Sequence, residues 1–149
     1  MTRILFLCLG NSCRSQMAEG FARRYGSDVM EPASAGFTPA LIIQPLTKQV
    51  MEAKNIKIEN QYPKDLGSID LHNFDLIINM SGLQLPSLST EVRNWKVEDP
   101  IGGSEELFTK ICNEIENLVM RLILDLRRQS REAVPAPGRH RLLRNRRIS

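Results

Sequence analysis

The sequence predicts an α/β protein built on a parallel sheet. Apolar segments with the length of strands alternate with segments in which apolar residues recur at helical spacing. The first apolar segment, residues 3–8 (RILFLC), is continuous, as in a strand that is buried on both faces. Strands that alternate with helices form βαβ units, whose strands are parallel and whose crossovers are right-handed. A length of 149 residues fits one domain.

A helix and a second strand are expected after the first strand. The apolar positions of this helix recur at spacings of three and four, and Gly26 is a typical helix stop. These positions are Met17, Ala18, Phe21 and Ala22. Residues 29–36 (VMEPASAG) are expected to form the second strand, although Pro32 weakens the pattern. Apolar residues at helical spacing between residues 45 and 55 predict a second helix.

The second half of the chain continues the alternation. Residues 75–80 (DLIINM) predict a third strand, and residues 94–100 (NWKVEDP) a short fourth strand that runs into Asp-Pro. A long amphipathic helix is expected after Ser104, an N-cap residue followed by two glutamates. Its apolar stripe consists of Leu107, Ile111, Ile115, Leu118, Leu122 and Leu126.

The composition indicates a globular protein of the cytoplasm. Hydrophobic residues make up 42% and charged residues 25%, and the apolar runs are far shorter than the ~20 residues that cross a bilayer. The first residues lack the apolar core and the cleavage pattern of a signal peptide. Three cysteines are an odd number, so at least one free thiol is expected instead of a disulfide framework.

The end of the chain differs in charge from the rest. Residues 127–149 contain eight arginines and one acidic residue, Glu132. We expect a domain over residues 1–128 and a basic, disordered tail over residues 129–149. The arginines would give the tail weak, salt-dependent contact with nucleic acid, although no aromatic residues are interleaved with them.

The turn after the first strand has the composition of an anion-binding loop. Its amides would lie at a helix N-terminus, which favours an anion, and Gly10 allows a tight turn. The planar guanidinium of Arg14 can bind a tetrahedral oxyanion with two hydrogen bonds. The sequence therefore predicts an oxyanion cradle. Its expected residues are Leu9, Gly10, Asn11, Ser12, Cys13 and Arg14.

Cys8 is expected at the mouth of this cradle. A helix N-terminus and an arginine both favour a thiolate over a thiol, and the hydroxyl of Ser15 can stabilise the thiolate by a hydrogen bond. A cysteine that ends a buried strand is usually a small core residue. The combination of a strand, Cys-x5-Arg and a following serine is more specific, and it predicts a nucleophile aimed at the bound oxyanion.

The segment CLGNSCRSQMAEG, residues 8–20, resembles the signature loop of the low-molecular-weight protein tyrosine phosphatase superfamily, which includes thiol-dependent arsenate reductases. The resemblance runs from about Arg3 to Leu126. It implies a three-layer α/β fold in which helices flank a four-stranded parallel sheet. It also implies a covalent intermediate on Cys8, which Ser15 and Asn11 would support, and oxyanion binding by Arg14.

The segment EDP, residues 98–100, carries the resemblance at a second point. Family members have an Asp-Pro on a late loop, and its carboxyl protonates the leaving oxygen, so the resemblance implies this role for Asp99. A positioned acid helps because hydroxide and alkoxide are poor leaving groups. Asp-Pro also commonly begins turns, and a purely structural Asp99 is the alternative.

Two branches of the superfamily share the first chemical step. Two features favour an arsenate reductase. Phosphatases usually carry proline at the position of Gln16, and they have aromatic residues after Asp-Pro, where this chain has Ile101-Gly102-Gly103. Thioredoxin-coupled reductases carry two more cysteines after the third strand, whereas residues 81–95 contain none. Reduction would then need an external thiol, such as glutathione or mycothiol with a glutaredoxin-like partner, or Cys13. Hydrolysis of phosphomonoesters is the alternative, and a non-catalytic oxyanion-binding module is a third hypothesis.

Two further expectations concern a cation and the remaining thiols. The resemblance implies a potassium site formed by Asn11, Glu19, Ser34 and Asp65. The alternative is that Glu19 is only a solvated residue of the helix. No other cofactor is required. Cys13 either packs the loop or forms a reversible disulfide with Cys8. Cys112 lies on the apolar side of the last helix and is expected to be a buried structural thiol.

Overall fold

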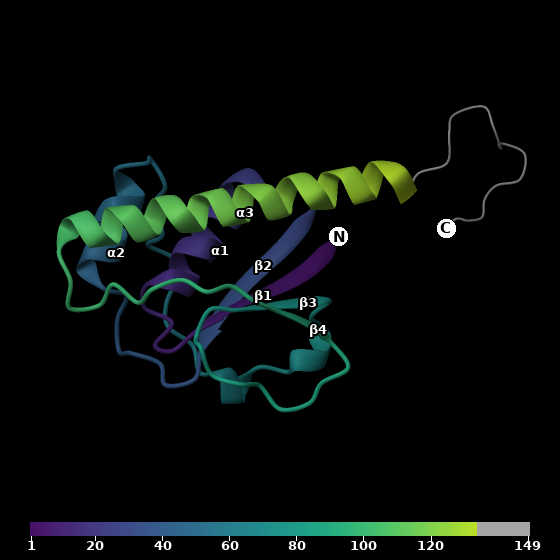
Figure 1. Ribbon diagram of the computed structural model, residues 1–149, viewed down its shortest axis with the longest axis horizontal. Coiled ribbons are helices and arrows are strands. Elements are labelled where there is room, and N and C mark those ends of the chain that lie inside the picture. The colour runs from purple at the N-terminus through teal and green to yellow at the C-terminus, as the bar shows by residue number, and fades with distance from the viewer. Residues whose placement is uncertain (134–149) are drawn as a thin grey trace, which may run out of the picture.

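The computed structural model describes residues 1–133 and has a four-stranded parallel sheet at its centre (Figure 1). The strand order is β2-β1-β3-β4. The strands are β1 (Thr2–Cys8), β2 (Met30–Gly36), β3 (Leu76–Asn79) and β4 (Glu91–Asn94). With a layer of structure on each face of the sheet, the predicted three-layer α/β fold is confirmed.

One face of the sheet is covered by all three α-helices of the described residues. They are α1 (Arg14–Tyr25), α2 (Pro45–Glu52) and α3 (Glu105–Ala133). Figure 1 shows α3 running along the length of the molecule, and α1 packs between it and the strands β1 and β2. Side chains from the sheet and the helices form one core here, with Phe6, Phe21 and Phe108 among its largest fully buried members. Full burial of a Val, Leu, Ile, Phe or Met side chain stabilises the fold by about 1.5–3 kcal/mol.

The other face is covered by two short 3₁₀ helices and the chain between β3 and β4. The 3₁₀ helices, η1 (Leu66–Ser68) and η2 (Leu71–Asn73), pack with this chain on Leu5, Leu7 and Ile77. Alternate residues of β1 therefore enter two different cores. This explains why residues 3–8 are continuously apolar and confirms the prediction of a strand buried on both faces.

The sheet brings the ends of its strands to one edge. Cys8 at the end of β1 lies opposite Gly36 at the end of β2, and Leu7 lies opposite Asn79 at the end of β3. Ligands of open parallel sheets bind beyond the carboxyl ends of the strands. The edge that carries Cys8 is thus the edge where a site is expected.

The fourth strand was predicted at the wrong place. β4 covers Glu91–Asn94, and residues 95–100 leave the sheet, although residues 94–100 were predicted to be the strand. β4 lies at the edge of the sheet and three of its four residues are exposed, so it lacks the apolar pattern of a buried strand. The more apolar Trp95 and Val97 belong to the connection, in which Trp95 packs against Phe6.

The last helix is longer than its apolar stripe. As predicted, Ser104 caps it, with its Oγ accepting a hydrogen bond from Leu107 N at 3.1 Å. The helix continues to Ala133 and crosses the predicted boundary between residues 128 and 129, so residues 129–133 are helical rather than part of a disordered tail. Just before these residues, Arg127 forms an ion pair with Asp28 at 2.8 Å and ties this part of α3 to the body.

Residues 134–149, on which the rest of the predicted tail and its contact with nucleic acid fall, lie outside the described residues. Within residues 1–133, none of the helices combines the length and the hydropathy that a bilayer crossing requires.

The packing of α3 can be tested by removing one buried side chain. Ile115 is fully buried in the core, so Ile115→Ala should lower the free energy of unfolding by about 2–5 kcal/mol. Leu124 lies on the same helix with 58% of its surface exposed, and Leu124→Ala should change the stability by only about 0.5 kcal/mol. Urea unfolding followed by circular dichroism measures both values. Equal losses in the two variants would contradict the packing of this face of α3 into the core.

Candidate active site

The loop between β1 and α1, residues 9–13, lies at the edge of the sheet and is held from outside by residues 37–44. Thr38 N donates to Leu9 O at 2.8 Å, Ala40 N to Gly10 O at 2.9 Å and Gln44 N to Ser12 O at 3.0 Å. The loop carbonyls are therefore directed toward residues 37–44. This orientation favours loop amides that face the centre of the turn, where they can bind an anion.

Two backbone features allow the loop to turn so tightly. Asn11 has a φ of 49°, in the left-handed region that asparagine tolerates better than most residues. Gly36, at the end of β2, lies so close to the loop that a Cβ atom there would be 2.8 Å from Asn11 N and from Leu9 O. A larger residue at position 36 would push the loop away from the sheet.

A chain of hydrogen bonds leads from Asn11 to the sulfur of Cys8. Asn11 Nδ2 donates to Ser15 Oγ at 2.7 Å, and Ser15 Oγ lies 2.8 Å from Cys8 Sγ. Because Asn11 supplies a hydrogen to the serine oxygen, the serine hydroxyl hydrogen is free to point at the sulfur. Asn11 Oδ1 in turn accepts from the backbone N–H of Lys64 at 2.8 Å, which fixes the amide orientation. The geometry supports the predicted stabilisation of a Cys8 thiolate by Ser15.

Arg14 is buried beside the cradle and does not use all of its N–H donors within the protein. Its Nη1 donates to Met80 O at 2.6 Å and to Val97 O at 3.0 Å. Its Nε is buried and has no hydrogen-bond partner in the described residues, and the same holds for Ser12 Oγ. A buried donor without a partner costs about 1–3 kcal/mol. Two such groups at one loop suit a site that an oxyanion fills.

Asp99 reaches the same place from the connection between β4 and α3. Its Oδ2 lies 3.5 Å from Arg14 Nη2, and its Oδ1 accepts a hydrogen bond from Ile101 N at 3.1 Å. The ion pair is longer than the 2.7–2.9 Å of a strong charge-assisted hydrogen bond, and 38% of the side chain is exposed. The carboxyl group is therefore near the cradle without being locked to the arginine, as a proton donor to a leaving oxygen must be.

The other two cysteines are poorly suited to thiol chemistry near neutral pH. Burial raises the pKa of the Cys13 thiol to about 12, although a hydrogen bond to Thr47 opposes the shift. Burial also raises the pKa of Cys112 to about 11, and its Sγ donates to Met51 Sδ at 3.7 Å within the core. Both thiols stay protonated well above neutral pH. The contacts of Cys112 fit the expected structural thiol, and those of Cys13 speak against its role as a redox partner.

All four residues of the expected potassium site are engaged in hydrogen bonds within the protein. Glu19 Oε1 accepts a hydrogen bond from Ser34 Oγ at 2.5 Å, and Glu19 Oε2 pairs with Arg23 at 2.8 Å. Glu19 is buried, so the alternative expectation of a solvated helix residue is also wrong. Asn11 Oδ1 is used by Lys64, and Asp65 Oδ1 accepts from Gly67 N at 2.9 Å. No metal-binding cluster of His, Cys, Asp and Glu occurs in residues 1–133. We therefore do not retain the potassium site.

The structure adds supports of the loop that the sequence did not indicate. Gln16 is fully buried, and its Nε2 donates to Asn11 O at 2.9 Å and to Tyr62 O at 3.1 Å. Gln61 Nε2 then donates to Gln16 Oε1 at 2.8 Å. The only signal in the sequence was a glutamine on the helix that begins at the loop, and its distant partners could not be read from it.

The contrast between the three thiols can be tested by alkylation. At mildly alkaline pH, iodoacetate should modify Cys8 first, because Ser15 supports its thiolate and the cradle attracts the carboxylate of the reagent. Cys13 and Cys112, whose raised pKa values keep them protonated, should react much more slowly. Peptide mass spectrometry measures each rate, and inorganic phosphate should slow only the first. Fast labelling of Cys13 in the folded protein would contradict this description.

Comparisons with known proteins agree with this fold. Residues 3–132 match the family model of the low molecular weight phosphotyrosine protein phosphatases. The chain is 32% identical to the glutaredoxin arsenate reductase of Synechocystis sp., over 83% of this chain and 97% of that protein. It is 36% identical to the arsenate reductase of Bacillus subtilis, over 76% of this chain and 89% of the relative.

Solved structures give the same result. A structure of an arsenate reductase in the phosphate binding state superposes with a TM-score of 0.80 at 30% identity, covering 85% of this chain and 99% of that one. The low molecular weight protein tyrosine phosphatase from T. tengcongensis gives 0.74 at 29% identity, covering 84% and 99%. The chain therefore belongs to the low molecular weight phosphotyrosine protein phosphatase family, and within it to the arsenate reductase-like branch.

Proposed function

We propose that this protein is an arsenate reductase that takes its electrons from an external thiol. The proposal is based on the positions of Cys8 and Arg14 at the loop between β1 and α1. Cys8 Sγ is supported by Ser15, and the buried Arg14 Nε has no partner in the described residues. A nucleophilic sulfur next to an oxyanion cradle can attack the central atom of a tetrahedral oxyanion.

In the first step, the Cys8 thiolate attacks the arsenic atom of arsenate. The loop amides and Arg14 hold the remaining oxygens, whose negative charge they stabilise. Asp99 gives its proton to the departing oxygen, which leaves as water, and an S–As bond remains on Cys8. The arsenic is still As(V) at this stage, so the first step needs no reductant.

In the second step, an external thiolate attacks Cys8 Sγ. An S–S bond forms, the S–As bond breaks, and its electron pair stays with arsenic, which leaves as arsenite, As(III). A second thiol then cleaves the mixed disulfide and restores Cys8. The thiol must come from outside, because Cys13 and Cys112 stay protonated near neutral pH and residues 81–95 contain no cysteine.

A glutathione-type thiol with a glutaredoxin-like protein fits this requirement. One relative is named a glutaredoxin arsenate reductase, and a Corynebacterium glutamicum structure with a TM-score of 0.74 at 26% identity is named thioredoxin-dependent. Both names point to a thiol protein as the partner. The lack of a second nucleophilic cysteine in the described chain favours a small thiol for the second step and the protein for the third.

Hydrolysis of phosphomonoesters is the second candidate function. The cradle and Asp99 would serve it equally, with water in place of the external thiol in the second step. However, Ile101 follows Asp99-Pro100 with 46% of its surface exposed, and two glycines come after it. An aryl phosphate would find no aromatic ring there, so the stacking and burial of its ring would contribute little.

A side-by-side assay tests the assignment. The purified protein should oxidise glutathione in an arsenate-dependent reaction with glutaredoxin, and it should hydrolyse p-nitrophenyl phosphate slowly or not at all. Cys8→Ser should abolish both activities, whereas Cys112→Ser should leave them nearly intact. Fast hydrolysis without arsenite formation would contradict the reductase proposal and favour the phosphatase, provided that both glutathione and mycothiol are tested as the thiol.

A second experiment tests Asp99 as the acid of the first step. Asp99→Asn should slow the cleavage of phosphomonoesters with poor leaving groups by about a hundredfold or more, which is within the range of general acids. Esters with good leaving groups, such as p-nitrophenyl phosphate, should lose much less because the leaving oxygen needs less protonation. Thermal stability should hardly change, since the pair with Arg14 is partly exposed. A uniform loss with a lower melting temperature would make Asp99 a structural turn residue.

A further inference from the structure

The carbonyl groups of residues 9–12 each accept a hydrogen bond from outside the loop, but the donors differ in kind. Those of Leu9, Gly10 and Ser12 accept from backbone N–H groups of residues 38–44. Asn11 O accepts instead from a side chain, because Gln16 Nε2 lies 2.9 Å away, and no other donor reaches it within residues 1–133. The peptide group that joins Asn11 to Ser12 is therefore held by the side chain of Gln16.

The direction of a carbonyl fixes the direction of the next N–H. The peptide group is planar, and in the trans form its C=O and N–H point in opposite directions. No peptide bond of the described residues is cis. Gln16 Nε2 also donates to Tyr62 O at 3.1 Å, so Asn11 O is directed outward, to the segment that contains Tyr62. The Ser12 N–H is then turned the opposite way, toward the centre of the loop.

The amide group of Gln16 is itself fixed in one orientation. Its side chain is fully buried, and Gln61 Nε2 donates to Gln16 Oε1 at 2.8 Å and to Gln16 O at 3.1 Å. An amide rotated by 180° would place its oxygen against the two carbonyls of Asn11 and Tyr62, which cannot donate. The hydrogen-bond donor of Gln16 therefore faces Asn11 O before any ion binds, which lowers the cost of ordering on binding.

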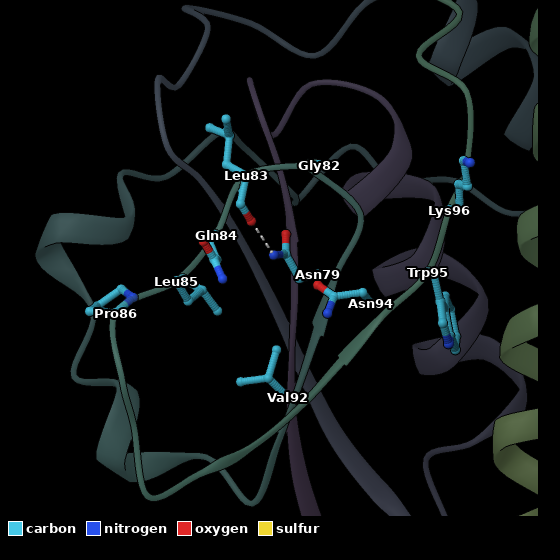
Figure 2. A pocket seen from close by; sticks show the side chains of 10 residues that line it. All are labelled: Asn79, Gly82, Leu83, Gln84, Leu85, Pro86, Val92, Asn94, Trp95 and Lys96. Carbon is cyan, nitrogen blue, oxygen red and sulfur yellow. Dashed lines mark hydrogen bonds between the residues drawn. The ribbon is translucent and has the colours of Figure 1, made fainter.

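A side-chain amide also fixes a backbone turn elsewhere at the carboxyl ends of the strands. Figure 2 shows Asn79 Nδ2 donating to Leu83 O, at 2.7 Å, in the turn after β3. The residues that line the groove beside this turn all lie between residues 79 and 96, so none belongs to the loop 9–13. Asn79 thus shapes a turn outside the cradle, whereas the carbonyl held by Gln16 belongs to the cradle itself.

We propose that Gln16 is a positioning residue of the oxyanion site, which turns the Ser12 N–H into the cradle and thereby raises the affinity for the ion. The inference rests on the proposed function, in which the cradle binds arsenate or its analogue phosphate. An anion that accepts from Ser12 N–H polarises the peptide, so the hydrogen bond of Gln16 to Asn11 O becomes stronger. Gln16 contributes to binding in this way without touching the ion.

The variant Gln16→Met tests this role, because methionine has a similar length and no N–H donor. Its dissociation constant for inorganic phosphate, measured by isothermal titration calorimetry, should rise about tenfold, as expected for the loss of one hydrogen bond to an anion. An unchanged dissociation constant would overturn the proposal.

The control is Thr47→Val, which also removes a buried donor from a carbonyl of the loop. Thr47 Oγ1 donates to Ser12 O at 3.1 Å, but Ser12 O keeps the N–H of Gln44 at 3.0 Å. The peptide that follows Ser12 stays in place, so the affinity for phosphate should change by no more than about twofold. Equal weakening in the two variants would mean that any loss of buried polar contacts loosens the loop, and the specific role of Gln16 would be refuted.

Nuclear magnetic resonance shows which amide is lost. Phosphate should shift the N–H signals of Gly10, Asn11, Ser12 and Cys13 in the unmodified protein, and Gln16→Met should abolish the shift of Ser12 alone. In the unmodified protein, phosphate should also shift the side-chain N–H signals of Gln16, a measurement that does not depend on the folding of a variant. A normal Ser12 shift in Gln16→Met, or side-chain signals of Gln16 that ignore phosphate, would contradict the proposal.

These measurements fail separately from the proposed function. If the unmodified protein does not bind phosphate, the cradle is refuted, and the proposed function with it. If it binds phosphate and Gln16→Met binds it equally well, only the role of Gln16 is refuted.

Discussion

The buried guanidinium of Arg14 joins the parts of the structure on which its chemistry depends. Its hydrogen bonds to Met80 O and Val97 O tie the start of α1 to the chain after β3 and after β4. The same side chain lies 3.5 Å from the carboxyl group of Asp99. Burying a charge is costly unless it is paired and hydrogen-bonded, and the partly exposed carboxylate compensates it only in part. An oxyanion in the cradle would complete the compensation, so the charge of Arg14 both holds the site together and selects its ligand.

This constraint also explains where the sequence misled the prediction of the fold. The segments whose side chains enter the cores were found close to their observed positions, because burial imposes the apolar pattern of β1, α1 and β3. β4 is an exposed edge strand, and its pairing is stabilised by backbone bonds that leave no trace in side-chain type. The apolar residues just after it were mistaken for the strand. They are apolar because they pack on the helical side of the sheet while Val97 O turns to Arg14.

The same distinction separates the parts of the site that could be predicted from the sequence from those that could not. The sequence could predict that Cys8, Arg14, Ser15 and Asp99 gather at one site, because each is a chemical type at a fixed spacing or before a proline. The groups that position them could not be predicted. Two are backbone carbonyls of distant residues, and others are the amides of residues 37–44 that fix the loop. The implied potassium site failed for a related reason, since the sequence does not tell which donor an oxygen such as that of Glu19 already meets.

A phosphatase and a reductase differ in the nucleophile that attacks after the first step. Two features of the structure bear on this nucleophile, namely the burial of the other thiols and the residues after Asp99. Burial raises the pKa values of Cys13 and Cys112, so neither thiol is a ready nucleophile near neutral pH. Water could still attack a phosphocysteine adduct, but forming that adduct from an aryl ester would draw on burial of the aryl ring, which the exposed Ile101 does little to support. The proposed reductase therefore needs a second molecule to bring the thiol to a nearly buried sulfur, because Cys8 is only 2% exposed. A thiol that is held beside Cys8 before it reacts attacks as part of a complex and loses less entropy at the reacting step, so the proposed reaction depends on how the second molecule is positioned as well as on the cradle.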